Sequence, residues 1–128
     1  MTNIELDQQK NIIPVFEELY LEHDKISHHV SGLGWKQRNE LVTHVYSGYN
    51  NHEKLNAAKT LWEKTHTQMN VLKWLCDLFI KHRDLYGYFT DYKGLIEEME
   101  GIIDQAIIME RYEIADTLTM WRNKLPNP

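Results

Sequence analysis

Seven histidines are the residues whose chemistry stands out in this chain, because imidazole and carboxylate groups on facing helices can hold a transition metal. A carboxylate-bridged site in a helical bundle needs a Glu-x-x-His step on each of two helices, with two further glutamates. Glu63 and His66 supply one such step, and no second step is present. Glu40 and His44 lie four residues apart and can share a helix face, but nothing completes their set. A metal-binding bundle is therefore only a third hypothesis, and we assign no metal ligand and no cofactor.

Signatures of other chemistry are missing from the sequence. It contains no glycine-rich phosphate loop, no His-Glu-x-x-His step and no local signature of a nucleophilic serine or cysteine. One cluster of carboxylates is formed by Glu97, Glu98, Glu100 and Asp104. It is either a solvated helix face or the acidic half of a docking surface. We therefore expect a protein that is not an enzyme.

The cysteine count and the apolar runs bear on the compartment. Cys76 is the only cysteine, so no intrachain disulfide can form and the reducing cytoplasm is the expected location. It lies within the apolar run VLKWLCDLFI (71–80), where a buried, unreactive thiol is expected. This run is too short and too often interrupted by charge to cross a membrane, and the first residues do not resemble a signal peptide.

Apolar residues recur at helical spacing over nearly the whole chain. Glycines in SGLG (31–34) predict the end of a first helix, and the second helix is expected to turn Leu41, Val42, Val45 and Tyr46 inward. Asn51 is the expected N-cap of a long helix whose stripe includes Arg83 and Tyr86. The expected helices cover about 13–30, 35–46, 52–86, 92–109 and 112–125, with a loop at 47–51.

The size and the helical pattern together predict the fold class. The chain has 128 residues, of which 42% are hydrophobic, and this is enough for one domain with a core of its own. No β-alternating segment and no long repeat is found. We predict a single all-α domain over 1–128: a bundle of about five helices with a long central helix (about 52–86) and a C-terminal helical hairpin (about 92–125).

The C-terminal hairpin has a recognisable pattern of small and aromatic residues. Ala106, Tyr112-Glu113, Ala115 and Leu118 resemble the UVR motif, a helical hairpin that docks onto proteins in excision repair and in some protease adaptors. The pattern departs from that family at Asp116, where a second alanine is usual, and at Thr119-Met120, where Arg-Asp is usual. The same residues also suit any tight antiparallel hairpin, which needs alanines at the helix contact and an aromatic residue at the corner.

In general character the chain resembles small phage-encoded accessory proteins that bind larger machines, RNA polymerase among them. This resemblance and the hairpin imply an adaptor or regulator with a larger protein partner, such as a transcription or DNA-repair complex. The expected partner-binding residues are Trp121, Met120 and Arg122 near the free end of the hairpin, with Glu97 and Glu98. Trp121 is equally compatible with a role as a cap of the core.

Two other kinds of contact are open alternatives. The net charge of −5 argues against a large nucleic-acid surface, although Lys59, His66 and Lys73 share a heptad position beside Trp62 and could form a small phosphate-facing strip. A solvated helix face explains the same residues. The length of the third helix also suggests a homodimer through its exposed half.

Overall fold

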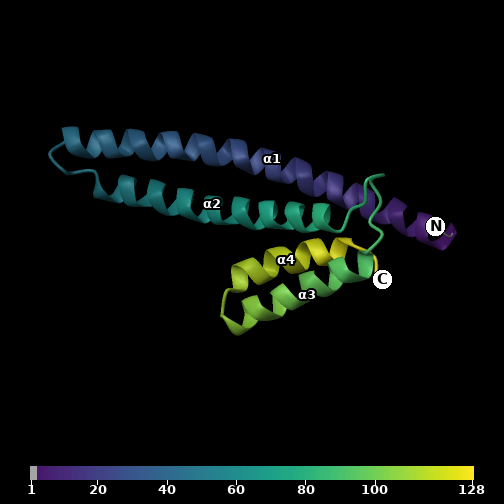
Figure 1. Ribbon diagram of the computed structural model, residues 1–128. Coiled ribbons are helices and arrows are strands. Elements are labelled where there is room, and N and C mark those ends of the chain that lie inside the picture. The colour runs from purple at the N-terminus through teal and green to yellow at the C-terminus, as the bar shows by residue number, and fades with distance from the viewer. Residues whose placement is uncertain (1–2) are drawn as a thin grey trace. The chain divides into compact units, whose positions relative to one another are not determined.

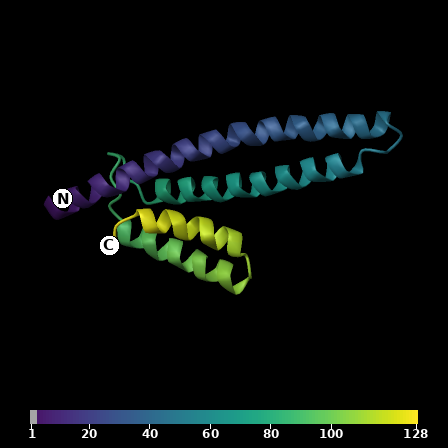
Figure 2. The same ribbon diagram turned by 180° about the vertical axis from the view of Figure 1, so that it is seen from behind.

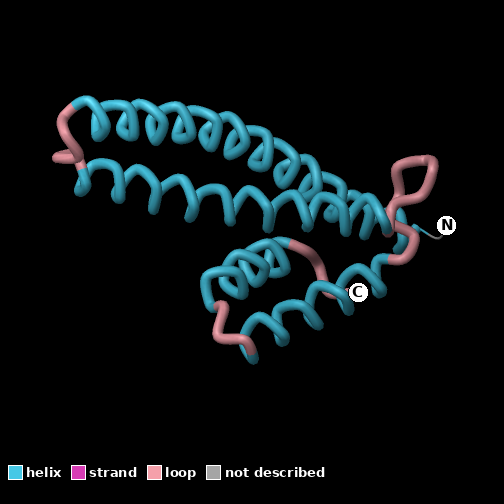
Figure 3. The backbone as a smooth tube through the Cα atoms, turned by 60° about the vertical axis from the view of Figure 1, so that its left-hand side comes forward, coloured by secondary structure: helices cyan, strands magenta, loops and turns pink. Residues whose placement is uncertain are grey.

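The computed structural model describes residues 3–128, which form four helices joined by three loops (Figure 1, Figure 3). They are α1 (Asn3–Tyr46), α2 (His52–Lys81), α3 (Tyr92–Ile108) and α4 (Tyr112–Lys124). The described residues contain no strand, so the predicted all-α class is confirmed, with four helices where about five were expected. None of these helices combines the length and the apolar character that a membrane crossing requires.

The first two expected helices are one continuous helix, α1. The prediction that SGLG ends a helix was wrong: Gly32 and Gly34 lie inside α1, and neither has a positive φ. Each glycine costs a helix only about 1 kcal/mol relative to alanine, and the apolar stripe continues across them from Val30 to Leu33, both buried. Tertiary packing therefore outweighs the local signal.

Continuity of α1 also reverses the expected orientation of its last turns. An unbroken helix keeps Val30 in phase with Leu33 and with His44, which is buried. Val42, Val45 and Tyr46, which were predicted to face inward, fall out of this phase and are half-exposed or more. Leu41 keeps the phase of Val30 but is also 50% exposed.

The first helix also begins earlier than predicted, at Asn3, so that Pro14 lies inside it. Pro14 is on the exposed side, whereas Ile12, Phe16 and Leu19 are buried. Proline lacks the backbone N–H that a helix uses for hydrogen bonding, and here this gap falls on the solvent-facing side of α1. The buried apolar side chains on the other side of the helix remain in register.

Helix α2 ends at Lys81, five residues before the predicted end. The carboxylate of Asp84 accepts hydrogen bonds from the backbone N–H groups of Tyr86 and Tyr88, and so offers the backbone an alternative to the helix. Gly87 completes this turn with a φ of 86°. Arg83 and Tyr86, which were expected on the inward stripe, are consequently exposed.

The chain divides into two compact units. Unit 1 comprises Met1–Leu21 and Val71–Pro128, and unit 2 comprises Glu22–Asn70. In unit 1, the first part of α1 and the last part of α2 pack with α3 and α4 around an aromatic centre. Phe79 is fully buried there, and its ring centroid lies 5.7 Å from those of both Phe16 and Phe89.

The C-terminal hairpin of unit 1 is formed as predicted, with α3 and α4 side by side and antiparallel (Figure 1, Figure 2). The two alanines expected at the helix contact, Ala106 and Ala115, are buried, as are Leu118 and Trp121. Gly101 of α3 does not mark a close helix contact, because an added Cβ there would meet no atom within 4 Å.

Unit 2 is an antiparallel pair formed by the rest of α1 and α2, joined by the expected loop at 47–51 (Figure 3). The Nδ1 atom of His44 accepts the backbone N–H of Asn51 at 3.1 Å, and the side-chain amide of Asn51 donates to the backbone and the carboxylate of Glu40. Asn51 therefore stands directly before α2 as predicted, but its amide nitrogen is directed to α1.

Candidate docking surface

The corner between α3 and α4 is closed by backbone hydrogen bonds. The N–H of Glu110 donates to the carbonyl of Ile107 at 3.0 Å, and the N–H of Arg111 donates to the carbonyl of Ala106 at 2.8 Å. This is the Schellman pattern that satisfies the last carbonyls of a helix. Glu110 occupies the left-handed position with a φ of 58°, where glycine is the usual residue. The corner thus falls at Glu110-Arg111, as the sequence predicted.

This closure leaves four large apolar side chains in solvent. Ile107, Ile108, Met109 and Tyr112 are 48%, 80%, 63% and 58% exposed, and we call them the corner surface. Tyr112 therefore does not seal the corner as expected, and Ile107, which continues the apolar stripe of α3, is about half-exposed. The available signal was the run IIM (107–109), because three consecutive large apolar residues exceed what one helix stripe can bury.

Acidic residues predominate in the segment of the chain that contains the corner surface. Residues 97–116 contain seven carboxylates and a single basic residue, Arg111. Two of the carboxylates are paired, Glu98 with Lys81 and Glu100 with Arg122. Within the described part of the chain, no ion pair involves the others, which are all exposed: Glu97, Asp104, Glu110, Glu113 and Asp116.

No protein-family model, no curated protein and no solved structure matches this chain.

The predicted partner-binding residues on α4 lie in different environments. Trp121 is only 2% exposed and belongs to the core of unit 1, with the Nζ of Lys124 4.5 Å from its ring centroid. Its burial agrees with the alternative that it caps the core. Met120 is 49% exposed. The guanidinium of Arg122 donates to Glu100 and to Asn127, so it is held by its own unit.

The two predicted acidic residues also differ. Glu97 is exposed and forms no ion pair within the described residues, whereas Glu98 is half-buried and accepts a hydrogen bond from Lys81 Nζ at 2.8 Å. The Nε2 of His82 lies 3.2 Å from the same carboxylate oxygen, and its Nδ1 lies 2.9 Å from Asp91. A protonated imidazole can donate to both carboxylates, and a neutral one to a single carboxylate. Glu98 therefore belongs to an internal polar cluster.

Acid stability provides a test of this cluster. The hydrogen bond from Lys81, with a smaller contribution from His82, lowers the pKa of Glu98 below its ordinary value of 4.5. A carboxylate with a lowered pKa stabilises the fold above its unfolded pKa, and this stabilisation is lost as the pH falls through the folded pKa. We expect Glu98→Gln to lower stability at neutral pH and to weaken the dependence of stability on pH below 4.5, measured by urea unfolding at several pH values. Glu97→Gln is the matched control and should leave both unchanged.

The residues of the predicted nucleic-acid strip are only partly brought together. Trp62 is half-buried beside Gly34, and its ring stacks on His66 with centroids 4.8 Å apart. Lys59 and Lys73 are exposed, and Lys73 belongs to unit 1. The stacked face of Trp62 is thus occupied by His66, which reduces what it could offer a nucleic-acid base.

The predicted histidine–carboxylate pairs are used in internal contacts. His44 accepts from the loop backbone, with the ring of His52 4.4 Å away between centroids. The Nδ1 of His66 lies 3.3 Å from the side-chain amide nitrogen of Asn70. Residues 3–128 contain no group of three or more histidine, cysteine, aspartate or glutamate residues arranged to hold a metal ion.

Cys76 is buried, as predicted. Burial, with a smaller contribution from the charge of Asp77, raises the pKa of its thiol to about 11. The thiol is therefore protonated at neutral pH and is a poor nucleophile.

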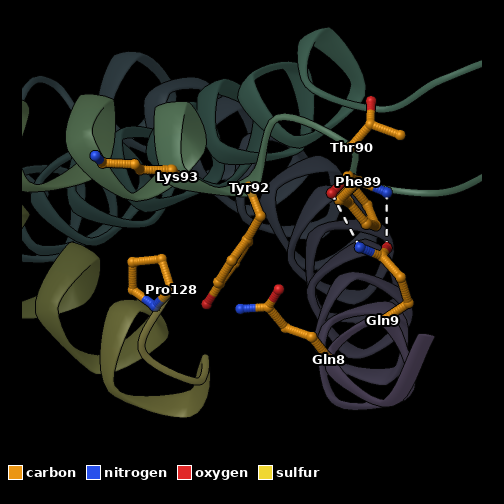
Figure 4. A pocket seen from close by; sticks show the side chains of 7 residues that line it. All are labelled: Gln8, Gln9, Phe89, Thr90, Tyr92, Lys93 and Pro128. Carbon is orange, nitrogen blue, oxygen red and sulfur yellow. Dashed lines mark hydrogen bonds between the residues drawn. The ribbon is translucent and has the colours of Figure 1, made fainter. Parts of the chain in front are cut away.

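A cavity of about 400 Å³ lies where α1 meets the loop before α3 (Figure 4). Its wall contains Gln9, whose buried amide donates to the carbonyl of Phe89 at 3.0 Å and accepts the N–H of Phe89 at 2.7 Å. The hydroxyl of Tyr92 donates to the carbonyl of Pro126. The polar groups of Gln9 and Tyr92 are thus occupied within the protein, whereas Thr90 and Lys93, which also line the cavity, are exposed.

Proposed function

We propose that the protein is a non-enzymatic helical adaptor that binds a larger protein through the corner surface. The partner would present an apolar pocket whose rim carries lysine or arginine residues. The apolar side chains of the corner would enter the pocket, and the surrounding carboxylates would meet the basic rim.

The observation that carries this proposal is the exposure of four large apolar residues at the most acidic part of the chain. Isoleucine, methionine and tyrosine at a rigid corner are suited to bind a pocket, because little backbone freedom is lost when they bind. Exposed apolar groups rimmed by polar ones are typical of protein-interaction sites.

Charge supports the choice of a basic partner. Unit 1 contains fourteen acidic and eight basic residues, and the excess is concentrated in residues 97–116. Complementary charge steers association and raises the rate of encounter. The resemblances of the hairpin and of the chain make a transcription or DNA-repair assembly the first class of partner to test.

Position-specific photo-crosslinking tests the proposal. A photoreactive amino acid is placed at Ile108, at the corner, or at Asn123, an exposed position near the far end of α4. Both proteins are irradiated in nuclease-treated cell extract. We expect one major crosslinked protein from the Ile108 position and much less of it from the Asn123 position. Equal crosslinking from both positions would argue against a docking role for the corner.

The captured partner, once purified, allows a quantitative prediction. Ile108→Asp should weaken binding about tenfold or more, because it places a charge where an apolar group is desolvated. Asn123→Asp adds the same charge elsewhere on the hairpin and should change affinity less than about twofold. Affinities are measured by calorimetry at two salt concentrations. Binding that disappears on nuclease treatment would instead favour the nucleic-acid alternative.

A further inference from the structure

Unit 2 has a small core of its own. Its buried aliphatic side chains are Val30, Leu33 and Ala58, accompanied by His44 and Thr65. Two helices can cover only one face of each other, so a helical pair with further apolar residues leaves them in solvent.

Five large apolar residues of α1 remain uncovered in this unit. Trp35, Leu41, Val42, Val45 and Tyr46 are 65%, 50%, 52%, 51% and 87% exposed, and we call them the α1 flank. By the helical repeat Trp35, Val42 and Tyr46 share one side of α1, and Leu41 and Val45 lie between that side and the core stripe. Their number within about three turns far exceeds the scattered apolar residues of an ordinary surface.

We propose that the α1 flank is the surface at which a second copy of this chain packs, with the two α1 helices antiparallel. The order of residues along the flank supports this occupant, because aromatic residues stand at both ends and aliphatic residues lie between them. Antiparallel packing about a two-fold axis near Leu41 places Trp35 of one copy against Tyr46 of the other and brings Val42 of both copies close to the axis. The flank is thus complementary to itself, as a two-fold interface requires.

The charge of unit 2 permits close approach of two copies. Residues 22–70 contain six lysine or arginine residues and five acidic ones, in contrast to the strongly acidic unit 1. Arg38 also lies at the flank, with its guanidinium carbon 5.7 Å from the ring centroid of Trp35. Two such surfaces therefore meet without strong like-charge repulsion.

The exposed area is also sufficient. The five side chains expose roughly 600 Å² per copy, so two copies would bury about 1,200 Å², the lower end of specific interfaces. An interface of this size, rich in aromatic residues, gives a dimer that forms at micromolar concentrations.

The first experiment measures the oligomeric state by sedimentation equilibrium, from about 10 to about 500 µM, the range relevant to an interface of this size. We expect a dimer for the unaltered chain, and a dissociation constant raised about tenfold or more by Val42→Asp. Thr43→Asp is the matched control, because Thr43 is adjacent, exposed and on another side of α1. A monomer at every concentration, or a dimer that is equally strong in both variants, would overturn the proposal.

A second experiment tests the geometry. In a Cys76→Ser background, Val42→Cys should crosslink to its counterpart with a short bis-maleimide, and Thr43→Cys should not. Equal crosslinking of the two positions would exclude the antiparallel arrangement. Circular dichroism checks that each variant remains helical. Ile108→Asp, which tests the proposed adaptor function, should leave the dimer unchanged, so the two proposals fail independently.

Discussion

Replacement of Trp121 by alanine is expected to lower the free energy of unfolding by about 3–5 kcal/mol, which is among the largest losses that one substitution can cause. Trp121 is 2% exposed in the core of unit 1, so the substitution removes many packing contacts and leaves a cavity. Urea unfolding followed by far-ultraviolet circular dichroism measures the loss.

Two control variants separate burial from other roles of this residue. Trp121→Phe keeps an aromatic ring and removes the buried indole N–H, which has no hydrogen-bond partner among the described residues, so the loss should be only about 1 kcal/mol. Met120→Ala, at the neighbouring exposed position, should change stability by less than about 0.5 kcal/mol. A stable, fully helical Trp121→Ala protein would mean that the indole is not part of the core.

The second large effect is expected at Gln9, where alanine should cost about 2–4 kcal/mol. The side-chain amide of Gln9 is the partner of both the N–H and the carbonyl of Phe89, a residue only 1% exposed. Without it, two buried backbone groups lose their hydrogen bonds, each with a penalty of about 1–3 kcal/mol. Amide hydrogen exchange should show the loss of protection at Phe89.

Gln8 provides the matched control for this prediction. It precedes Gln9 on α1 and makes a single long hydrogen bond of 3.4 Å to the carbonyl of Asn127 at the surface. Gln8→Ala should therefore change stability by less than about 0.5 kcal/mol and leave the exchange of the Phe89 amide unaltered. If the two variants were equally stable, the anchoring role of Gln9 would be wrong.

The sequence was sufficient to predict the all-α class and the bounds of the C-terminal hairpin, because these depend on local signals. Ala106 and Ala115 mark the helix contact, and an apolar stripe runs on each side of a short corner. The beginning and the continuity of α1 could not be predicted in the same way. Gly32 and Gly34 are strong local signals for a helix end, and only the packing of Leu33 and His44 outweighs them.

The candidate site was less accessible to sequence reasoning than the fold. A tryptophan near the end of a hairpin is compatible with a buried or an exposed position, and only the structure places Trp121 in the core. Conversely, Ile107 follows the core stripe in phase with Ile103, yet the corner leaves it half-exposed. Whether a residue at the end of an apolar stripe is buried depends on where the neighbouring helix stops. This depends on tertiary packing, which the local sequence does not specify.

The α3–α4 corner is closed by its backbone alone, so its binding specificity can change without a change of fold. Its hydrogen bonds join backbone atoms of Ala106, Ile107, Glu110 and Arg111, and none of them uses a side chain of the corner surface. The shape of the corner is therefore insensitive to what those four side chains are. A library randomised at Ile107, Ile108, Met109 and Tyr112 should retain the fold in most of its members, so new binding specificities could be selected on an unchanged scaffold.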